Sequence, residues 1–301
     1  MTVFSLTKTF QDICPHLHLQ EPLSKHTSWA IGGPADYFAD VHQLSELIAL
    51  RKIVDEHQLP IFFIGAGSNV LVSDRGIRGL VIHLQGEFRQ AKFEGSTVIA
   101  GAGMWMPVLV KQAAEHGLSG IESLIGVPGT IGGGLIMNAG TRDGVLGDVV
   151  ESVTIVDKGG VPKWHTRKDL EFKYRHSNLE GTWIAQTTLR LKSADSTIIQ
   201  QKIDALLSYR SKTQPLGTSN CGSVFKNPPG DHAARLIEAA GLKGTRQGGA
   251  IVSERHANFI VNDNKASAQD VLTLIHHIQK RVHDQFRIDL VPEVKQVGDW
   301  S

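Results

Sequence analysis

The sequence predicts an α+β fold in two domains, and three observations support this prediction. The 301 residues, of which 41% are hydrophobic, suffice for roughly two domains of about 150 residues each. Segments with helical periodicity and segments with strand periodicity follow one another along the chain. A polar stretch, residues 192–197, separates two groups of such segments and places the predicted boundary near residue 195.

The first group of segments predicts mixed helices and strands. Apolar residues recur at helical spacing in 42–58 and again in 105–116, where Gly117 ends the pattern. Short apolar runs predict strands, and a reversal at Glu94-Gly95 predicts a hairpin. The predicted strands are 60–64, 79–84, 149–156 and 183–191, and the predicted hairpin is 88–100.

Residues 121–147 interrupt this pattern. They contain glycines at positions 126, 129, 132, 133, 134, 140, 144 and 147. This density is too high for a regular helix, because glycine loses much conformational freedom in a helix interior. The neighbouring residues are too apolar for disorder. We therefore expect an ordered, buried loop that faces a ligand.

The segments after residue 195 predict a second, smaller α+β domain. It opens with a helix at 198–209 and contains a short helix at 233–240 that Gly241 stops. Ser267 is a good N-cap for a long amphipathic helix at 268–286. A final strand, 288–294, is expected to carry Glu293.

Composition excludes several classes of function. Lys plus Arg number 31 and Asp plus Glu 30, so no global field favours nucleic acid or a membrane surface. The two cysteines, Cys14 and Cys221, are too few for a disulfide framework or a zinc cluster, which fits a reducing compartment. No secretory leader and no apolar run of about 18 residues is visible. We expect a cytoplasmic monomer.

Histidine is frequent, with 14 residues, but the sequence predicts no metal site. No His-Glu-x-x-His pattern occurs. His276 and His277 are adjacent on the last predicted helix and therefore point in different directions, as expected for a solvated face.

The loop Gly65-Ala66-Gly67-Ser68-Asn69 follows a predicted strand and invites comparison with the dinucleotide-binding fingerprint. The comparison fails, because the sixth position is Val70 and residues 71–76 have an extended pattern instead of a helical one. Successive amides in a concave glycine turn can still wrap a diphosphate, and Ser68 and Asn69 add neutral donors.

Two further glycine segments strengthen the case for a nucleotide-like cofactor. These are Gly101-Ala102-Gly103 and the longer Gly126-Val127-Pro128-Gly129-Thr130-Ile131-Gly132-Gly133-Gly134. Tight turns between strands remain the alternative explanation for all three segments. A Gly-Lys-Ser/Thr P-loop is absent, which disfavours a nucleotide hydrolase.

The segment Gly222-Ser223-Val224-Phe225-Lys226-Asn227-Pro228 places a hydroxyl among turn-forming residues. Pro228 and Pro229 cannot continue a helix, so Ser223 is expected on a loop or strand end, where functional groups are often displayed. A solvated turn without function is the alternative. Cys221, two residues earlier, is interpreted as a packing thiol rather than a redox group.

Seven ordered motifs resemble the UDP-N-acetylenolpyruvoylglucosamine reductases, the MurB flavoenzymes of bacterial cell-wall synthesis. The resemblance covers nearly the whole chain, and the interval 190–214 is similar to the branch that lacks an extra tyrosine loop. The motifs are Ile31-Gly32-Gly33-Pro34-Ala35, Gly65-Ala66-Gly67-Ser68-Asn69, Gly126-Val127-Pro128-Gly129-Thr130-Ile131-Gly132-Gly133, Tyr174-Arg175-His176-Ser177, Gly222-Ser223-Val224-Phe225-Lys226-Asn227-Pro228, His256-Ala257-Asn258-Phe259 and Pro292-Glu293-Val294.

The resemblance implies a fold and a domain organisation. It implies a vanillyl-alcohol-oxidase (PCMH)-type FAD-binding domain of two subdomains, followed by a smaller substrate domain. The expected bounds are an N-terminal segment 1–27, an FAD domain 28–195 and a substrate domain 196–301. The cofactor-binding residues expected on this basis are Gly65, Ala66, Gly67, Ser68, Asn69, Gly101, Gly126, Val127, Pro128, Gly129, Thr130 and Gly133.

The resemblance also implies an activity in peptidoglycan precursor synthesis, and with it a role in cell shape and division. The expected reaction uses NADPH and non-covalent FAD to reduce UDP-N-acetylglucosamine enolpyruvate to UDP-N-acetylmuramate. Hydride addition to this enol ether develops negative charge on its carboxylate, which must be stabilised before the α carbon is protonated. Arg175 is expected to hold the carboxylate, Ser223 to donate the proton, and Glu293 to polarise the same charge.

Other residues are expected at the substrate with less specific roles. Tyr174, Lys226, Asn227 and His256 are candidates for substrate binding, and Asn258, Arg246 and Gln247 for the uridine diphosphate site. Several of the proposed site residues have a structural alternative. Arg175 could form a surface ion pair, Glu293 could be a solvated residue at a strand end, and Lys226 and Asn227 could be turn residues.

Two other functions remain open at this point. A flavin oxidase of the same fold class would pass electrons to oxygen and carry a covalent flavin, which needs a His, Cys or Tyr near the glycine segments. A UDP-sugar-binding module without turnover would need no proton donor, so Arg175, Ser223 and Glu293 together disfavour it.

Overall fold

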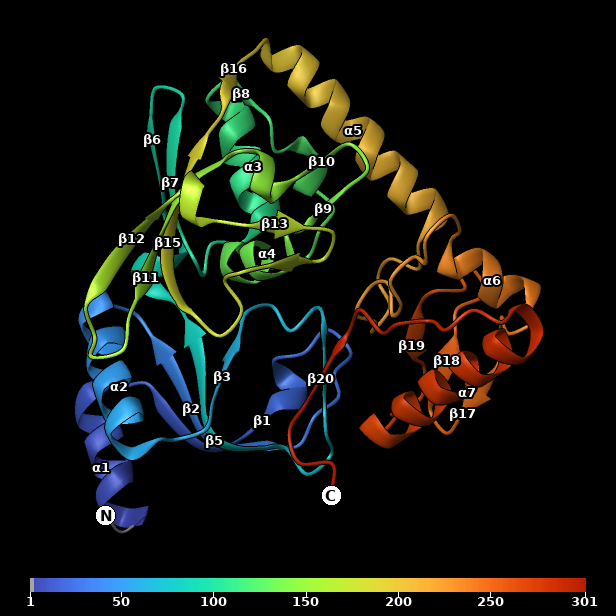
Figure 1. The fold of residues 1–301 in the computed structure, drawn as a ribbon, viewed down its shortest axis with the longest axis horizontal. Coiled ribbons are helices and arrows are strands. Elements are labelled where there is room, and N and C mark those ends of the chain that lie inside the picture. The colour runs from blue at the N-terminus through green and yellow to red at the C-terminus, as the bar shows by residue number, and fades with distance from the viewer. Residues whose placement is uncertain (1–2) are drawn as a thin grey trace. The chain divides into compact units, whose positions relative to one another are not determined.

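The computed structural model describes residues 3–301, which form two compact units (Figure 1). Unit 1 comprises the segment up to Leu19, then Tyr37–Gly65 and Gly79–Ser208. Unit 2 comprises Gln20–Asp36, Ala66–Arg78 and Tyr209–Ser301. The units are therefore interleaved in sequence, and the domain bounds at residues 27 and 195 stay predictions.

Unit 1 contains most of the secondary structure. Its four-stranded sheet has the order β1-β2-β5-β3, in which β3 and β5 are parallel, and its five-stranded antiparallel sheet has the order β12-β11-β15-β7-β6. The strands are β1 (Leu17–Pro22), β2 (Pro34–Val41), β3 (Ile61–Ile64), β5 (Ile77–Leu84), β6 (Ala91–Glu94), β7 (Thr97–Gly101), β11 (Val150–Val156), β12 (Pro162–Thr166) and β15 (Trp183–Arg190), and the unit division cuts β1, β2 and β5.

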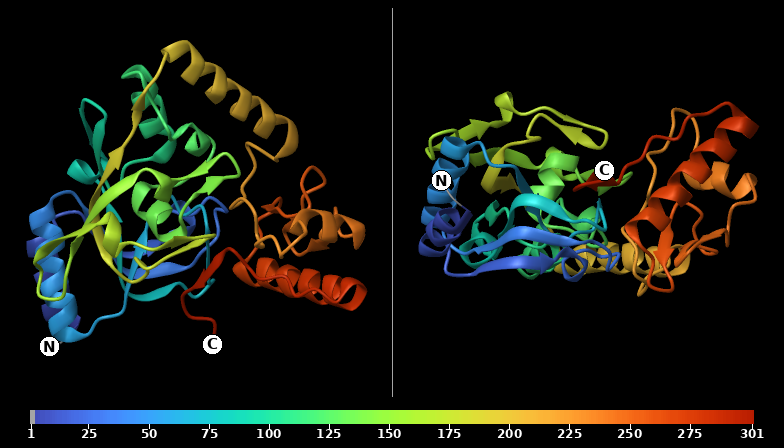
Figure 2. Two further views of the ribbon diagram at one scale, coloured as in Figure 1. Left: turned by 45° about the horizontal axis from the view of Figure 1, so that its top comes forward. Right: turned by 90° about the horizontal axis from the view of Figure 1, so that it is seen from below.

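Short strand pairs and helices complete unit 1. The pairs are β8 (Leu118–Ser119) with β16 (Lys192–Ser193), β9 (Gly140–Thr141) with β10 (Gly144–Val145), and β13 (Phe172–Lys173) with β14 (His176–Ser177). The helices are α1 (Val3–Ile13), α2 (Leu44–His57), α3 (Met106–Glu115), α4 (Ile131–Met137) and α5 (Ser196–Thr213), whose last residues belong to unit 2. Figures 1 and 2 show α1 and α2 side by side along the four-stranded sheet.

Local sequence explains the helices that periodicity predicted. Glu46 accepts hydrogen bonds from the backbone amides of His42 and Gln43, which closes a capping box at the start of α2. Leu47 and Leu50 of α2 are fully buried in the core of unit 1, together with Phe10 of α1. The predicted helices, the hairpin turn at Gly95 and the first-domain strands are confirmed.

One prediction in unit 1 is wrong. Residues 131–137 lie within the predicted glycine loop but form helix α4. The Thr130 hydroxyl accepts the Gly133 amide at 3.5 Å, and Gly134 leaves room for Met106, whose sulfur would lie 2.8 Å from an added Cβ. Tertiary packing therefore selects glycine here and outweighs its low helix propensity.

Unit 2 has its own core and a small antiparallel sheet of order β17-β18-β19. The elements are β17 (Arg246–Gln247), β18 (Ala250–Val252), β19 (Ile260–Asn262), α6 (Ala233–Ala239) and α7 (Ala268–Phe286), together with the parallel pair β4 (Val70–Val72) and β20 (Lys295–Val297). Ser267 caps α7 by accepting the Asp270 amide at 3.0 Å, as predicted. Asp74 accepts the amides of Ala268 and Gln269 at the same helix end.

The predicted strand 288–294 is wrong. Only an isolated bridge between Phe225 and Pro292 forms there, and the strand begins at Lys295, where Val70 supplies a partner. Pro292 lacks the amide that a ladder needs, which explains why regular pairing starts beyond it.

His276 and His277 are exposed on α7, as expected. Among residues 3–301, no helix combines the length and apolarity needed to span a membrane.

Candidate active site

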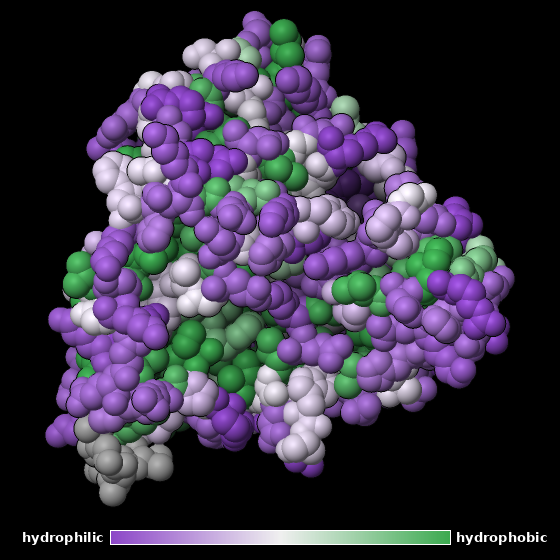
Figure 3. Space-filling model, in the orientation of Figure 1, coloured by the Kyte–Doolittle hydropathy of each residue, from purple (hydrophilic) through white to green (hydrophobic). Residues whose placement is uncertain are grey.

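A small open pocket in unit 1 has a cavity volume of about 70 Å³, within about 470 Å³ of empty space that includes open solvent. It is lined by Phe63, Ile64, Gly65, Leu84, Ala102, Gly103, Thr130, Gly132, Gly133, Ile136, Thr182 and Ile184. Its walls are apolar except for two threonines, and no charged residue lines it. Figure 3 shows hydrophobic side chains gathered over strand β3, which supplies Phe63 and Ile64.

The glycines that line this pocket differ in what an added side chain would meet. A Cβ at Gly65 would lie 2.4 Å from the Thr130 hydroxyl, so this position excludes any larger residue without movement of Thr130. A Cβ at Gly132 would lie 3.1 Å from the Ala102 carbonyl. At Gly133 the nearest group outside its own helix backbone is the Thr130 hydroxyl, at 3.7 Å, so a side chain there meets little protein.

The backbone around α4 is satisfied within the protein. The amide of Ile131 donates to the Met104 carbonyl at 2.8 Å, and the amide of Gly132 donates to the Ala102 carbonyl at 2.7 Å. These bonds fix the segment 102–104 against the start of α4. The pocket therefore offers shape and apolar surface more than free helix amides.

The predicted cofactor residues of unit 1 divide into two groups. Gly65, Thr130 and Gly133 line the pocket. Gly101 does not line the pocket, and glycine is required there by close packing, because an added Cβ would lie 2.2 Å from the Phe88 carbonyl. The segment 126–129 precedes α4 outside the lining, where the Gly129 carbonyl accepts the Met106 amide at 2.9 Å.

Sequence reasoning missed several lining residues. Gly103 and Gly132 lie inside the predicted glycine segments but were not among the expected cofactor residues. The apolar walls at Phe63, Leu84 and Ile184 carry no sequence signal, because they are indistinguishable from core residues until the fold is known.

The predicted cofactor residues 66–69 lie in unit 2. Gly67 has φ of +60°, and its Cβ would lie 2.0 Å from the His26 carbonyl, so close backbone packing requires glycine. The Asn69 side chain does not stand free as a donor. Its Nδ2 donates to the Glu293 backbone carbonyl at 3.2 Å, and the backbone carbonyl of Asn69 accepts the Lys295 amide at 3.0 Å.

Ser223 lies in a turn whose following residues are firmly held. The Val224 amide donates to the Asn258 carbonyl at 2.9 Å. The Asn258 side chain binds both groups of Phe225, accepting its amide at 3.0 Å and donating to its carbonyl at 2.8 Å. Asn258 therefore holds this turn in place, and its expected contact with the uridine diphosphate stays a prediction.

Glu293 lies beside the same turn. Its amide donates to the Val224 carbonyl at 2.7 Å. Burial raises the pKa of the Cys221 thiol well above its usual value, and the nearby charge of Glu293 raises it further. Cys221 is a buried core thiol, as interpreted from the sequence. The structure therefore brings Ser223, Cys221 and Glu293 together in unit 2.

Arg175 belongs to unit 1, in the two-residue turn between β13 and β14. Its φ is +53°, an unusual value for a residue with a side chain. Its Nη1 donates to the Gly140 carbonyl at 3.2 Å, and its guanidinium carbon lies 5.3 Å from the centre of the Tyr174 ring. Strained backbone of this kind is common at functional sites.

The remaining predicted substrate residues have mixed environments. The Asn227 side chain accepts the Ala233 amide at 3.1 Å at the start of α6, as its structural alternative requires. The Lys226 amide donates to the Val291 carbonyl at 2.9 Å. Burial lowers the pKa of His256, whose ring lies 4.6 Å from that of Phe259. Tyr174 is 58% exposed. Arg246 pairs with Asp263 across 2.6 Å.

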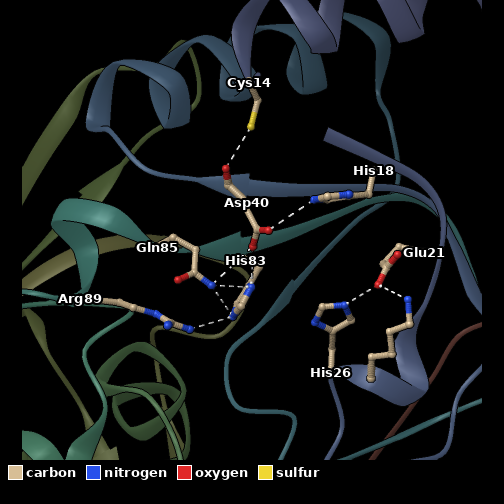
Figure 4. A network of polar contacts seen from close by, with 9 residues as sticks. Cys14, His18, Glu21, His26, Asp40, His83, Gln85 and Arg89 are labelled. Carbon is tan, nitrogen blue, oxygen red and sulfur yellow. Dashed lines mark hydrogen bonds and ion pairs between the residues drawn. The ribbon is translucent and has the colours of Figure 1, made fainter. Parts of the chain in front are cut away.

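A polar cluster away from the predicted site residues lies on three adjacent strands of unit 1, β1, β2 and β5 (Figure 4). Asp40 Oδ1 lies 2.8 Å from His83 Nδ1, and Asp40 Oδ2 lies 3.6 Å from His18 Nε2. Burial acts to raise the pKa of Asp40, but the hydrogen bond and charge of His83 and the charge of His18 outweigh it, so the pKa is lowered. Within residues 3–301, no group of three or more His, Cys, Asp or Glu side chains is arranged to hold a metal ion.

The unit 1 pocket fits part of a flavin nucleotide. FAD is large and has flat aromatic rings, and the pocket offers a space between apolar walls in which a side chain at Gly133 would meet little protein. The lining contains no carboxylate to repel a diphosphate and no His, Cys or Tyr to bond covalently to the ring. The residues present are consistent with a non-covalent FAD.

Comparisons with known proteins identify the family. A profile of an FAD binding domain matches residues 35–164, and a profile of the UDP-N-acetylenolpyruvoylglucosamine reductase C-terminal domain matches residues 214–297. The UDP-N-acetylenolpyruvoylglucosamine reductase 2 of Symbiobacterium thermophilum is 46% identical over 280 residues, which cover 92% of this chain and 91% of the relative. The reductase of Alkalilimnicola ehrlichii is 45% identical, with 93% and 94% covered.

A solved structure shows the same relationship in three dimensions. The crystal structure of UDP-N-acetylenolpyruvylglucosamine reductase (MurB) from Thermus caldophilus superimposes with a TM-score of 0.82 at 36% identity, covering 93% of this chain and 99% of that one. The resemblance inferred from the motifs and the α+β, PCMH-type fold class are confirmed. The chain belongs to the UDP-N-acetylenolpyruvoylglucosamine reductase family.

Proposed function

We propose that this chain catalyses the NADPH-dependent reduction of UDP-N-acetylglucosamine enolpyruvate to UDP-N-acetylmuramate. Family membership over more than nine-tenths of the chain supports the reaction and the use of FAD. When bound, FAD supplies hydride transfer, first from NADPH and then to the enolpyruvyl double bond. The protein acts in the cytoplasm as a monomer, and the two free, buried cysteines are compatible with that location.

The apolar pocket of unit 1 binds part of the cofactor in this proposal. Gly65, Gly132 and Gly133 lie along the face proposed for a flat ring, and Thr130 offers a neutral hydroxyl at its edge. Ala66, Gly67, Ser68 and Asn69 stay proposed cofactor residues on the basis of the family resemblance. Water is excluded from the pocket walls by Phe63, Leu84 and Ile184.

Ser223 donates the proton that completes the reduction. Hydride addition leaves a strongly basic α carbon, and a positioned hydroxyl is acidic enough to protonate such a centre. The observation that carries this assignment is the 2.7 Å hydrogen bond from the Glu293 amide to the Val224 carbonyl, which places the carboxyl-bearing residue beside the serine turn. Glu293 acts on the same developing charge, as a protonated acid or through water.

Arg175 holds the substrate carboxylate. A guanidinium offers two parallel donors and remains charged at any relevant pH. The positive φ fixes the direction in which the side chain leaves the backbone, and the bond from Nη1 to the Gly140 carbonyl holds the guanidinium at its far end. Tyr174, Lys226 and His256 are second-tier contacts to the sugar nucleotide in this proposal.

The test separates the two half-reactions by following flavin absorbance under anaerobic conditions. Protein with bound FAD should be bleached by NADPH and then recoloured by UDP-N-acetylglucosamine enolpyruvate, with UDP-N-acetylmuramate identified by mass. An oxidase would recolour with oxygen alone, and a binding module would carry no extractable flavin. Absence of recolouring by the enolpyruvate would exclude the proposed reaction.

Ser223→Ala tests the proton donor. Bleaching by NADPH should be unchanged, whereas recolouring by substrate should slow by roughly 10²- to 10⁴-fold, the range expected for loss of general acid catalysis. Ser219→Ala is the matched control, because Ser219 lies four residues earlier and its carbonyl, not its side chain, accepts the Asn262 amide at 2.9 Å. Equal slowing of both half-reactions in Ser223→Ala would contradict the assignment.

A further inference from the structure

Asn258 is a polar residue in the core of unit 2, with only 3% of its surface exposed. Its side-chain amide binds a single residue's backbone at both ends: Oδ1 accepts the Phe225 amide at 3.0 Å, and Nδ2 donates to the Phe225 carbonyl at 2.8 Å. A buried amide satisfied in this way resists rotation, because any other orientation leaves polar atoms without partners.

The backbone of Asn258 extends the same contact. Its carbonyl accepts the Val224 amide at 2.9 Å, and its amide donates to His256 Nδ1 at 3.3 Å. Three hydrogen bonds from one residue therefore hold the two positions that directly follow Ser223.

The opposite side of this segment is bound to the residues around Glu293. The Val224 carbonyl accepts the Glu293 amide at 2.7 Å, and the Lys226 amide donates to the Val291 carbonyl at 2.9 Å. Residues 224–226 are therefore held from two directions, by Asn258 and by residues 291–293, without forming a regular strand.

The chain before Ser223 is anchored two residues away, where Cys221 is buried in the core and Asn220 forms a bridge with Val261. Gly222 lies between these anchors and Ser223. It has φ of +78°, an added Cβ would meet no atom within 4 Å, and its amide donates to the Asn220 side chain at 2.9 Å. On the other side of Ser223, the contacts of Asn258 begin at the very next residue.

We propose that Asn258 is a positioning residue that sets the Ser223 hydroxyl for proton delivery in register with Glu293. This inference rests on the proposed function, since it concerns the proton that Ser223 donates. It assigns to Asn258 a role in one half-reaction only, because reduction of the cofactor by NADPH needs no proton from Ser223.

The experiment compares two isosteric changes, Asn258→Asp and Asn262→Asp. Asn262 is a matched control: its side chain also binds two backbone groups, donating to the Trp29 carbonyl at 2.9 Å and accepting the Ala266 amide at 2.8 Å. Neither of these partners belongs to the Ser223 turn. Melting temperatures are measured for both variants, and both are expected to fall.

The half-reactions should then separate the variants. At pH 8 the ionised carboxylate introduced by Asn258→Asp keeps the acceptor but loses the donor to the Phe225 carbonyl, so recolouring by substrate should slow by about 10- to 100-fold. Bleaching by NADPH should stay within about 2-fold of wild type. Asn262→Asp should leave the ratio of the two half-reactions unchanged.

The pH profile provides a readout that a purely structural role would not give. A buried carboxyl tends to be protonated above its ordinary pKa, and in the protonated state the Asn258→Asp side chain regains a donor for the Phe225 carbonyl. The recolouring rate of Asn258→Asp, divided by that of wild type, should therefore rise as pH falls. His256, Glu293 and Cys221 are the titratable groups facing this segment; they are present in both proteins, and the ratio serves to remove their contribution.

Several outcomes would overturn the proposal. These are a wild-type recolouring rate in Asn258→Asp at every pH, an equal loss in both half-reactions, or the same pH-dependent loss in Asn262→Asp. If Asn258→Asp does not fold, Asn258→Ser retains one hydrogen bond, and an unchanged recolouring rate in that variant is equally fatal. Failure of wild type to recolour with the enolpyruvate would instead contradict the proposed function.

Discussion

The pocket of unit 1 and the Ser223 turn of unit 2 are built in opposite ways. The pocket keeps its space because Gly133 has no side chain, and Gly65 and Gly132 allow the segments around it to pack closely. The turn is positioned because hydrogen-bonding groups are present, chiefly those of Asn258 and the backbone of Glu293. A change that adds atoms should therefore damage the first region, and a change that removes polar groups should damage the second.

The largest effect is expected from Glu293→Gln, which removes an acid from the Ser223 turn but keeps the backbone bond to Val224. Recolouring of reduced flavin by substrate should slow by roughly 10²- to 10⁴-fold, because the developing charge loses its proton source or polariser. Stopped-flow absorbance measures the rate. Glu254→Gln, an exposed position in the same unit, is the control, and full hydride transfer in Glu293→Gln would refute the donor role.

A second change adds atoms to the pocket. Gly133→Leu should lower the affinity for FAD at least about 10-fold, because the new side chain meets little protein and occupies cofactor space. The ratio of flavin to protein absorbance after dialysis measures this. The melting temperature without flavin should hardly change; a variant that keeps its flavin would show that the cofactor does not enter this pocket.

The neighbouring glycine sharpens the comparison. Gly134→Ala places a Cβ 2.8 Å from the Met106 sulfur and 3.1 Å from Leu146, inside the core instead of the pocket. Overpacking of this kind costs about 1–3 kcal/mol, offset by about 1 kcal/mol from the better helix propensity of alanine. Denaturant unfolding should show a net loss of stability with the flavin content retained. Flavin loss without destabilisation would reverse the roles assigned to the two glycines.

The smallest effect concerns the Asp40 cluster, which belongs to neither region. The pKa of Asp40 is lowered in the folded protein, so its contribution to stability is present above the unfolded pKa of about 3.9 and is lost as pH falls through the folded pKa. Asp40→Asn should therefore destabilise at pH 7 by about 1 kcal/mol and much less near pH 3. Thermal melting at the two pH values tests this; an equal loss at both would exclude the charge interaction with His83 and His18.

The sequence predicted those elements whose stabilising contacts lie within their own residues. The helix 268–286 was predicted because its cap and apolar stripe lie within its own residues. Helix α4 was missed because its glycines are explained by Met106 and Ala102, which are close only in the folded chain. The strand at 295–297 was placed too early because its partner, Val70, is remote in sequence.

The site was predictable to a similar extent. The resemblance supplied Ser223 and Glu293, and the structure adds the backbone bonds that make them neighbours. The clamp by Asn258 could not be derived from the motif that contains it, because the peptide it binds lies 33 positions away. Asn69 stays a predicted cofactor residue, and its side-chain bond to the Glu293 carbonyl is a contact that sequence periodicity does not reveal.

The bond from Asn69 to Glu293 joins residues 224 positions apart. Contacts of such long range require the closure of a large loop, which has an entropic cost. The bond cannot form before residue 293 has been synthesised, so the proposed proton-delivery geometry is incomplete until then. Incompletely folded molecules should therefore show no turnover until these two segments pair, so the time at which turnover begins would report when folding is complete.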